Sequence, residues 1–476
     1  MITRRPLLWG AAASALIVPA ARAQSADDFV GEWNGALDLG SQRLRLRMVI
    51  AAGPTVTMYS VDQGNGAFQG SDVRIDGTAL VVLFPAINAS YRGTLSNGRI
   101  EGQFTQGGTL PLVFTRGEAA AAAPPSALTQ AQLDTLRTES GAPGMGAAAA
   151  NSQGARVNVA SGLRCIGRTE PITTSDQWHL GSITKSMTAT LIAKCAEAGV
   201  VSWDDTVGGV LGAAIPEMRA EYRDASFRHL CSHRAGLQAN IDLAQLAAFP
   251  RESADARADR IAYARLGLMQ APVGPKATTF TYSNTGYVIA GAMLETKLNA
   301  TWESLIQRQL FEPLRMASAG QGAPGAPGAF DQPIGHAPGS TTVGATGASA
   351  SLQPYPPGTA PFTDNPAALG PAGRVHANFE DVLKYLAAHR DRASYLRRES
   401  WDLLHTPPFG GPYAMGWQRR GDALWHNGSN TLWYAEVMFD RTSGCAAVAA
   451  ANDGRAGEMG RPVGTALLAA AAAVTR

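Results

Sequence analysis

Gly181-Ser182-Ile183-Thr184-Lys185 is the stretch on which the interpretation of this 476-residue chain depends. Apolar residues recur every four positions from Ile183 to Cys195 and Gly199 follows, which predicts an amphipathic helix that ends at that glycine. Ser182 would lie at the helix N-terminus, where backbone N–H groups favour negative charge, with Lys185 one turn away on the same face. A serine is a weak nucleophile until another group accepts its proton, and a lysine that is desolvated in a cleft can do so.

Tyr282-Ser283-Asn284 is a second segment that suits this chemistry. This second segment matters to the interpretation because Ser182 and Lys185 alone would also fit a capping serine followed by a solvated lysine. A tyrosine oxygen near a lysine ammonium can exist partly as phenolate, act as a general base and then return the proton. Asn284 could orient Lys185 or accept a substrate amide. The alternative for Tyr282 is a buried structural side chain with a satisfied hydroxyl group.

His426-Asn427-Gly428-Ser429, just before a strand-like run, is the third segment. Gly428 would allow a substrate to approach the strand backbone. The N–H of Ser429 could pair with the N–H of Ser182 as an oxyanion hole, and His426 could donate to a substrate carboxylate. Because His179-Leu180-Gly181 has the same short pattern, a turn histidine is the alternative.

The three segments resemble the motifs of the serine β-lactamase and penicillin-binding-protein family. They follow the same order and are separated by 97 and 142 residues. The similarity is to the branch of class C β-lactamases, D-alanyl-D-alanine carboxypeptidases and related esterases, and it extends over about 128–453. Three further segments are similar to the family patterns LLSHTSGL, PLGM and PAGG, respectively 230–237, 311–316 and 371–373.

The resemblance implies an α+β fold with a β-lactamase/transpeptidase-like domain. In it an antiparallel sheet with flanking helices stands beside an all-α subdomain, and the active site lies between them. The implied catalytic residues are Ser182, Lys185 and Tyr282, and the implied substrate-binding residues are Asn284, His426, Gly428 and Ser429. No cofactor and no metal are implied.

The third motif departs from the β-lactamases, which carry Lys-Thr-Gly where this chain has His426-Asn427-Gly428. An unperturbed histidine, with a pKa of about 6.5, is mostly neutral at pH 7, so it would hold a β-lactam carboxylate less firmly than a lysine. We therefore expect hydrolysis of a D-Ala-type peptide or a small ester through a Ser182 acyl-enzyme. A β-lactamase, or a cell-wall-binding protein without turnover, is the alternative.

Two other hydrolase classes fit this sequence less well. His229 and His233 are four residues apart on a predicted helix and could bind zinc, but no glutamate follows His229 as it would in a His-Glu-x-x-His motif. No Gly-x-Ser-x-Gly sequence occurs, which argues against an α/β-hydrolase. The expected substrate is a small molecule, peptide or ester, including those derived from peptidoglycan.

The sequence predicts four parts: a signal peptide at 1–23, an antiparallel β domain at 24–117, an Ala/Pro linker at 118–127 and the hydrolase domain at 128–476. Tight hairpins are expected at Asp76-Gly77 and Asn97-Gly98. In the hydrolase domain we expect helices at 129–140 and from about 463 to 474, and strands at 146–150, 155–163, 433–440 and 445–452. The Gly- and Pro-rich stretch 317–371 is expected to form part of the cleft rim.

The N-terminus indicates export. Arg4 and Arg5 precede an apolar stretch and a small-residue end, which is typical of a cleaved signal peptide and similar to a twin-arginine signal. Without the three arginines of this segment, the 40 basic residues fall to 37 against 38 acidic ones, which gives no reason to expect a nucleic-acid partner. We expect a periplasmic or secreted protein without a membrane span. The four irregularly spaced cysteines are expected to be buried free thiols.

Overall fold

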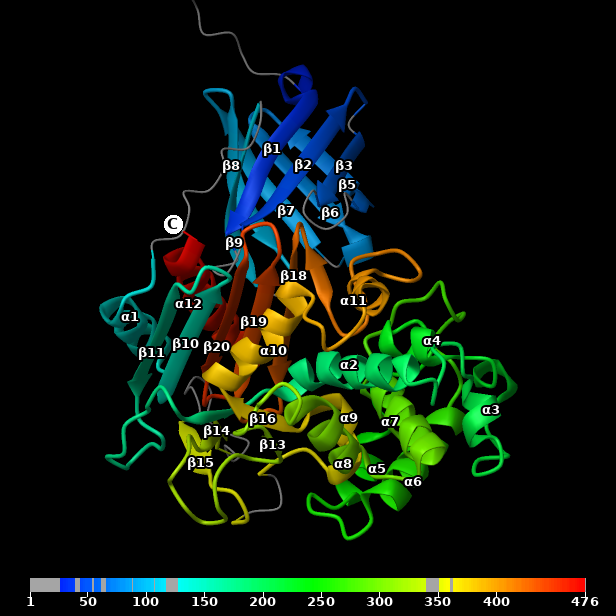
Figure 1. Cartoon of the computed structure of the whole chain (residues 1–476). Coiled ribbons are helices and arrows are strands. Elements are labelled where there is room, and N and C mark those ends of the chain that lie inside the picture. Colours follow the sequence, from blue (N-terminus) through cyan, green and yellow to red (C-terminus); the bar gives the residue numbers. More distant parts are fainter. Residues whose placement is uncertain are drawn as a thin grey trace, which may run out of the picture. The chain divides into compact units, whose positions relative to one another are not determined.

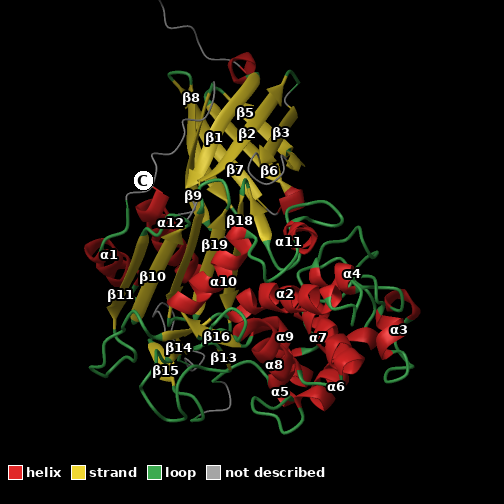
Figure 2. Cartoon of the chain, in the orientation of Figure 1, coloured by secondary structure: helices red, strands yellow, loops and turns green. Residues whose placement is uncertain are grey.

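A computed structural model describes residues 26–38, 43–53, 55–60, 66–87, 89–106, 108–116, 127–339, 351–359 and 363–475. The predicted signal peptide and nearly all of the predicted linker lie outside these residues. The chain forms two compact units, one mainly from the first 119 residues and one that contains 120–476, and each is described by itself. Figures 1 and 2 show their elements.

The first unit is a nine-stranded sheet in the order β4-β3-β2-β1-β9-β8-β7-β6-β5. Side chains alternate along its strands, as in β7, where every second residue is buried. The hairpin at Asn97-Gly98 has both residues at positive φ, whereas the other centres on Gly77 and Thr78, one residue later than predicted. The strands are β1 (Gly31–Asp38), β2 (Arg43–Ala51), β3 (Thr55–Ser60), β4 (Gly66–Gln69), β5 (Ser71–Asp76), β6 (Ala79–Phe84), β7 (Ala89–Ser96), β8 (Arg99–Thr105) and β9 (Thr109–Thr115).

The second unit contains a six-stranded antiparallel sheet in the order β11-β10-β20-β19-β18-β17. Strands from both ends of the unit meet at the pairing of β10 with β20, which closes the sheet around the helices inserted between them. The strands are β10 (Gly144–Asn151), β11 (Arg156–Gly162), β17 (Gln418–Arg420), β18 (Ala423–Ser429), β19 (Tyr434–Asp440) and β20 (Cys445–Ala451).

Helices cover both faces of this sheet, and side-chain alternation gives each face its own core. On one face, α1 (Gln130–Ser140) and α12 (Ala456–Thr475) cover Met145, Ala147 and Ala149 of β10. On the other face, Ala148 and Ala150 join the larger core, which includes α10 (Phe379–Asp391) (Figure 1). Because most of these strand residues are alanines, the helices can pack close to the sheet.

The remaining helices form the all-α part beside the sheet (Figure 2). Together with the antiparallel sheet and the N-terminal all-β unit, this confirms the predicted α+β fold class. No helix among the described residues is both long and apolar enough to cross a membrane. The helices are α2 (Thr184–Glu197), α3 (Val207–Leu211), α4 (Phe227–Cys231), α5 (Leu243–Ala248), α6 (Ala256–Met269), α7 (Asn284–Leu298), α8 (Trp302–Ile306), α9 (Gly370–Gly373) and α11 (Arg398–His405).

The structure corrects one expectation about this unit and confirms another. The last helix begins at Ala456, well before the expected start near residue 463, because Pro462 is tolerated inside it. Pro462 lies in the buried face with Met459 and Val463, so packing outweighs the hydrogen bond that proline cannot donate. The four cysteines are free and buried, as predicted.

The Gly- and Pro-rich stretch 317–371 contains regular strands, although 340–350 and 360–362 lie outside the described residues. Its β13 (Gly320–Gln321) joins β12 (Gln177–His179) and β16 (Val375–Asn378) in a small sheet. Its β14 (Gly335–Pro338) pairs with β15 (Leu352–Tyr355) as a separate two-stranded sheet.

Candidate active site

Ser182 lies in a single 3₁₀ turn, Gly181–Ile183, directly before α2. The sequence predicted it at the start of the helix, and the structure places it just ahead of that start. Its side chain is partly buried, whereas the residues on either side are buried. The turn is therefore anchored on both sides, with the serine at the edge of the accessible surface.

The turn packs directly on β18, and two glycines make this possible. A Cβ atom on Gly428 would lie 2.0 Å from the carbonyl oxygen of Leu180 and 2.7 Å from the amide nitrogen of Ser182. A Cβ atom on Gly181, whose φ is +50°, would lie 2.4 Å from the amide nitrogen of Ser429. The similar sequences 179–182 and 426–429 thus face each other, and the two amides expected to form an oxyanion hole lie on contacting segments.

This contact corrects the reason given for Gly428. The sequence suggested that its missing side chain admits a substrate to the strand. In the structure the space is filled by the nucleophile turn itself. Ser429, at the end of the same strand, pairs with Tyr434 of β19, and its hydroxyl oxygen accepts the N–H of Thr431.

Lys185 is fully buried, and its Nζ has three oxygen partners. These are Oγ of Ser182 at 2.9 Å, Oδ1 of Asn284 at 2.6 Å and the carbonyl oxygen of Ala372 at 2.8 Å. The amide and carbonyl oxygens can only accept, so they use two N–H bonds of the amine. The third position on Nζ faces the serine oxygen.

Burial lowers the pKa of Lys185 well below its usual value. Among the residues that the structure describes, no carboxylate forms an ion pair with its Nζ, so nothing nearby compensates for the lost hydration of an ammonium. A neutral amine has two N–H bonds and one lone pair, which matches the two acceptors and the serine hydroxyl. The arrangement suits a general base for Ser182.

Tyr282 lies next to both groups. Nζ of Lys185 is 4.9 Å from the centre of its ring. Burial raises the pKa of Tyr282 far above its usual value, and the hydrogen bond to Ser182 opposes this only in part. The partial phenolate expected from the sequence is therefore not supported, because the lysine beside it is itself desolvated. Tyr282 suits the role of a proton donor better than that of a resting base.

Asn284 is the first residue of α7 and is held from two sides. Its amide nitrogen Nδ2 donates to Oδ1 of Asn240 at 2.8 Å, and its backbone N–H donates to the carbonyl of Ala239. The preceding Ser283 caps the helix by accepting the N–H of Gly286. These contacts orient Oδ1 of Asn284 toward Lys185, as the sequence suggested.

His426 is buried on β18, and both of its ring nitrogens are occupied. Nε2 is 2.9 Å from the hydroxyl oxygen of Tyr413, and Nδ1 is 2.5 Å from the carbonyl oxygen of Asn427. Burial and the nearby Lys185 lower the pKa of His426 to about 3. To bind a substrate carboxylate, as expected from the sequence, His426 would have to give up one of these two hydrogen bonds. It would then offer the carboxylate a neutral ring and not a positive charge.

Sequence reasoning missed Tyr413, and it treated His233 only as a possible metal ligand and as part of the matched segment 230–237. The two rings are 4.5 Å apart, and His233 also lies 4.3 Å from the ring of Tyr282. Nδ1 of His233 accepts the N–H of Ser283, so this ring supports the tyrosine motif. Three residues after Tyr413, Gly416 packs closely on α2, where a Cβ atom would lie 2.5 Å from Cα of Ser186.

The helix pair that could have bound zinc, which the sequence disfavoured, does not form. Helix α4 ends at Cys231, and His233 lies beyond it at a φ of +60°, so His229 and His233 do not share a helix face. Nδ1 of His229 instead lies 3.0 Å from the hydroxyl oxygen of Ser226. Among the described residues, no group of three potential metal ligands occurs.

A family model, a relative and several solved structures match much of this chain. The Beta-lactamase family model matches residues 129–472. Penicillin-binding protein 4 of Amycolatopsis lactamdurans is 28% identical over 270 residues, which cover 55% of this chain and 63% of that protein. The chain thus spans less than two thirds of that relative.

Solved structures share the fold at low identity. The octameric penicillin-binding protein homologue from Pyrococcus abyssi has a TM-score of 0.55 at 20% identity, over 71% of this chain and 77% of that one. The D-amino acid amidase from Ochrobactrum anthropi SV3, complexed with L-phenylalanine, has a TM-score of 0.56 at 20% identity, over 71% and 96% of the two chains.

Proposed function

Because this chain belongs to the Beta-lactamase family of serine hydrolases, we propose that it hydrolyses a small ester or a peptide-like amide through an acyl-enzyme on Ser182. The observation that carries this proposal is the buried amine of Lys185, with two N–H bonds directed to fixed acceptors and its third position on the serine oxygen. A solvated lysine after a capping serine would have neither the burial nor these partners.

Acylation begins with proton transfer from Ser182 to Lys185. The serine oxygen attacks the substrate carbonyl carbon, and negative charge develops on the carbonyl oxygen. The backbone N–H groups of Ser182 and Ser429 stabilise this oxyanion. Asn284 and the carbonyl of Ala372 keep the amine in place as it gains its proton, so the geometry needs little reorganisation.

The leaving group then takes a proton, and Tyr282 is the donor. Its hydroxyl group is protonated in the free protein, because burial raises its pKa. As the carbon–oxygen or carbon–nitrogen bond breaks, Tyr282 donates to the leaving atom and recovers a proton from Lys185. Water next attacks the acyl carbon and gives its proton to the same pair, which releases the acid and restores Ser182.

The chemistry around His426 favours substrates without a carboxylate at this position. The histidine is neutral over the physiological range and has both ring nitrogens engaged. A β-lactam or a peptide with a free C-terminal carboxylate would lose the cation that such substrates favour. Esters and amides need no such partner, so they rank above β-lactams.

Turnover of a matched set of substrates tests this proposal. We expect hydrolysis of 4-nitrophenyl acetate, and faster hydrolysis of a D-alanyl-D-alanine peptide amide than of the same peptide with a free carboxylate. Nitrocefin should be the poorest substrate. Ser182→Ala should abolish turnover and labelling by a fluorophosphonate probe. Turnover by Ser182→Ala would contradict the acyl-enzyme, and nitrocefin as the best substrate would instead support a β-lactamase.

Labelling without turnover would support the alternative of a penicillin-binding protein. A fluorescent penicillin that acylates Ser182 stably, with none of the esters or amides hydrolysed, is the result that would establish it. The arrangement around Lys185 favours turnover, because the same amine can act as the base in both acylation and deacylation.

We also propose that the chain acts outside the cytoplasm. The support is the sequence alone, namely Arg4, Arg5 and the apolar stretch that follows them. Expression of the full chain followed by cell fractionation tests this: a shortened protein in the periplasm or medium is expected, and an uncut cytoplasmic protein would contradict it.

A further inference from the structure

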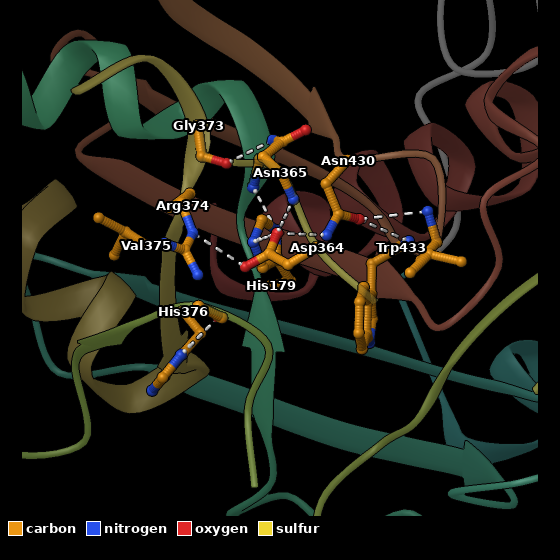
Figure 3. Close-up of polar contacts among 12 residues, drawn as sticks. His179, Asp364, Asn365, Gly373, Arg374, Val375, His376, Asn430 and Trp433 are labelled. Carbon is orange, nitrogen blue, oxygen red and sulfur yellow. Dashed lines mark hydrogen bonds and ion pairs between the residues drawn. The ribbon is translucent and has the colours of Figure 1, made fainter. Parts of the chain in front are cut away.

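Asp364 is a buried carboxylate that the proposed reaction does not use. Its side chain is 3% exposed, and it lies among His179, Arg374 and Asn430 (Figure 3). Its Oδ1 is within 3.0 Å of three nitrogen atoms: Nε2 of His179, Nδ2 of Asn430 and the backbone N of Asn365. Its Oδ2 accepts from Nε of Arg374 at 3.2 Å. Each partner leads to a different segment of the catalytic site.

His179 connects Asp364 to the nucleophile turn. Its Nδ1 accepts the N–H of Gly181 at 3.1 Å, and its Nε2 lies 3.0 Å from Oδ1 of Asp364, a close contact that is not aligned as a hydrogen bond. Because Nδ1 accepts, the ring proton is on Nε2, beside the carboxylate. The negative charge of the carboxylate favours this tautomer, which is the one that can accept from Gly181. Gly181 immediately precedes Ser182, whose N–H is one of the two proposed oxyanion donors.

Asn430 connects Asp364 to the strand that carries the other donor. Its Nδ2 donates to the carboxylate, and its Oδ1 accepts the N–H groups of Leu432 and Trp433, each at 3.2 Å. These three hydrogen bonds fix the turn between β18 and β19. Asn430 immediately follows Ser429, so the carboxylate is linked to residues adjacent to both proposed donors.

A third connection leads to the support of the base. Arg374 binds Asp364 directly, and Nδ2 of Asn365 donates to the carbonyl oxygen of Gly373 at 2.9 Å. These contacts hold the segment that contains Ala372, whose carbonyl oxygen accepts from Nζ of Lys185. One carboxylate and its neighbour therefore anchor three segments of the proposed site, namely the nucleophile turn, the end of β18 and the segment that contains Ala372, but not the segment that carries Tyr282 and Asn284.

We propose that Asp364 is a positioning residue that sets the separation of the Ser182 and Ser429 amides through His179 and Asn430. This inference rests on the proposed acyl-enzyme function. Asp364 touches neither substrate nor reacting atoms, and it acts by holding two donors in the geometry that matches a tetrahedral oxyanion. Burial alone would raise the pKa of Asp364, but His179, Arg374 and Asn430 hold it below its usual range, so the carboxylate is a permanent acceptor.

Asp364→Asn tests this with almost no change in shape. The carboxylate faces donors on both oxygens, so in either orientation the new amide places its NH₂ group against another donor. We expect kcat for 4-nitrophenyl acetate to fall about 10- to 100-fold per titrated serine, since a displacement of about 1 Å can cost about 100-fold. We expect KM to change less than about threefold, because ground-state binding does not use the oxyanion geometry.

Two further variants make the test specific. His179→Asn can still accept the N–H of Gly181 but cannot reach Asp364, so it should reproduce the loss in kcat, and combining it with Asp364→Asn should add less than the product of the two losses. Glu252→Gln is the matched control. Glu252 is 92% exposed and binds the outer side of Arg374, so it belongs to the same network without touching Asp364. It should leave kcat unchanged.

A boronic acid inhibitor separates positioning from a general loss of structure. Its tetrahedral adduct with Ser182 places an oxygen atom where the oxyanion forms, so its Kd should rise in Asp364→Asn by the same factor as kcat falls. Unchanged kcat and boronate affinity in folded, fully titratable Asp364→Asn or His179→Asn would overturn the proposal. If Asp364→Asn does not fold, His179→Asn decides alone. Turnover by Ser182→Ala would instead overturn the proposed function and would be seen independently of Asp364.

Discussion

Replacing Gly428 with alanine should separate the nucleophile turn from β18 and thereby weaken the oxyanion hole. The added Cβ atom would lie 2.0 Å from the carbonyl oxygen of Leu180 and 2.7 Å from the amide nitrogen of Ser182. Both atoms belong to backbone, so no flexible side chain can move away. Gly428 does not have positive φ, so the whole effect comes from this contact.

The magnitude follows from the displacement. Non-bonded carbon atoms are normally about 3.5 Å or more from their neighbours, so turn and strand must separate by more than about 1 Å. Misplacement by about 1 Å can cost about 100-fold in rate, which is about 2.7 kcal/mol of transition-state stabilisation. Overpacking of this kind also costs about 1–3 kcal/mol of folding stability. The variant should therefore fold and bind substrate but turn it over slowly.

The assay compares kcat/KM for 4-nitrophenyl acetate per serine titrated by a fluorophosphonate, with thermal unfolding measured on the same samples. Gly457→Ala is the control, since Gly457 is exposed on α12 and a Cβ atom there would meet nothing within 4 Å. It should leave kcat/KM unchanged. If Gly428→Ala folds, titrates fully and retains parental kcat/KM, the argument that these two segments form the oxyanion hole is refuted.

Three further outcomes follow from the buried ionisable groups. Lys185→Met should lower kcat/KM for an ester about 10²- to 10⁴-fold, because it removes the base. It should not lower Tm, because it also removes an amine that is costly to bury. Turnover within about tenfold of the parent would exclude Lys185 as the base. The pH profile of kcat/KM should rise through one inflection below the usual pKa of lysine, with no inflection near pH 6.5 from His426, since its pKa is lowered to about 3; a step near 6.5 that disappears in His426→Gln would contradict this. Burial also lowers the pKa of His376 to about 4 and that of His405 to about 3, as it lowers that of His426 to about 3. The stability that these three histidines contribute is therefore complete above pH 6.5 and is lost as the pH falls toward their pKa values in the folded protein, by up to about 1.4 kcal/mol per pH unit for each. Urea unfolding that shows the protein becoming more stable as the pH falls from 6.5 to 4.5 would refute this.

Sequence reasoning located the parts of the site that are encoded in short local segments. Ser182 and Lys185 lie on consecutive turns, and Tyr282 and Asn284 flank a helix cap, so a few neighbouring letters fix their relative positions. The structure brings these groups together around one amine. Their individual roles stay predictions until the variants above are measured.

The same reasoning could not find residues that act singly and from a distance. Tyr413 reaches His426, Asn240 reaches Asn284, and Asp364 reaches three segments at once. None of them stands in a pattern of its own, and their significance comes from tertiary contacts between distant parts of the chain. Asp364 was hidden further because it lies in a stretch whose composition resembles that of an irregular loop.

Among the charge predictions made from sequence, a desolvated Lys185 and a neutral His426 agree with the burial of these groups, whereas a partial phenolate at Tyr282 does not. An exposed Lys185 beside Tyr282 would be an ammonium and would favour a phenolate. In the structure both groups are desolvated, so the lysine tends to lose its charge and the tyrosine keeps its proton. Burial also lowers the pKa of His426, so its ring stays uncharged. Identifying these residues was possible from their letters, but assigning their protonation required knowledge of their surroundings.

Two buried ionisable groups near Ser182 show how the same protein interior produces opposite behaviour. Asp364 has an arginine, a histidine and amide donors around it, so it keeps its charge and can serve as a fixed anchor. The hydrogen-bond partners that the structure describes for Lys185 are neutral oxygens, so it tends toward the uncharged amine and can accept a proton. An anchor must not change its protonation during turnover, whereas a base must. The placement of counter-charges around Asp364 and their absence from the described surroundings of Lys185 therefore fit the separate tasks that we assign to them.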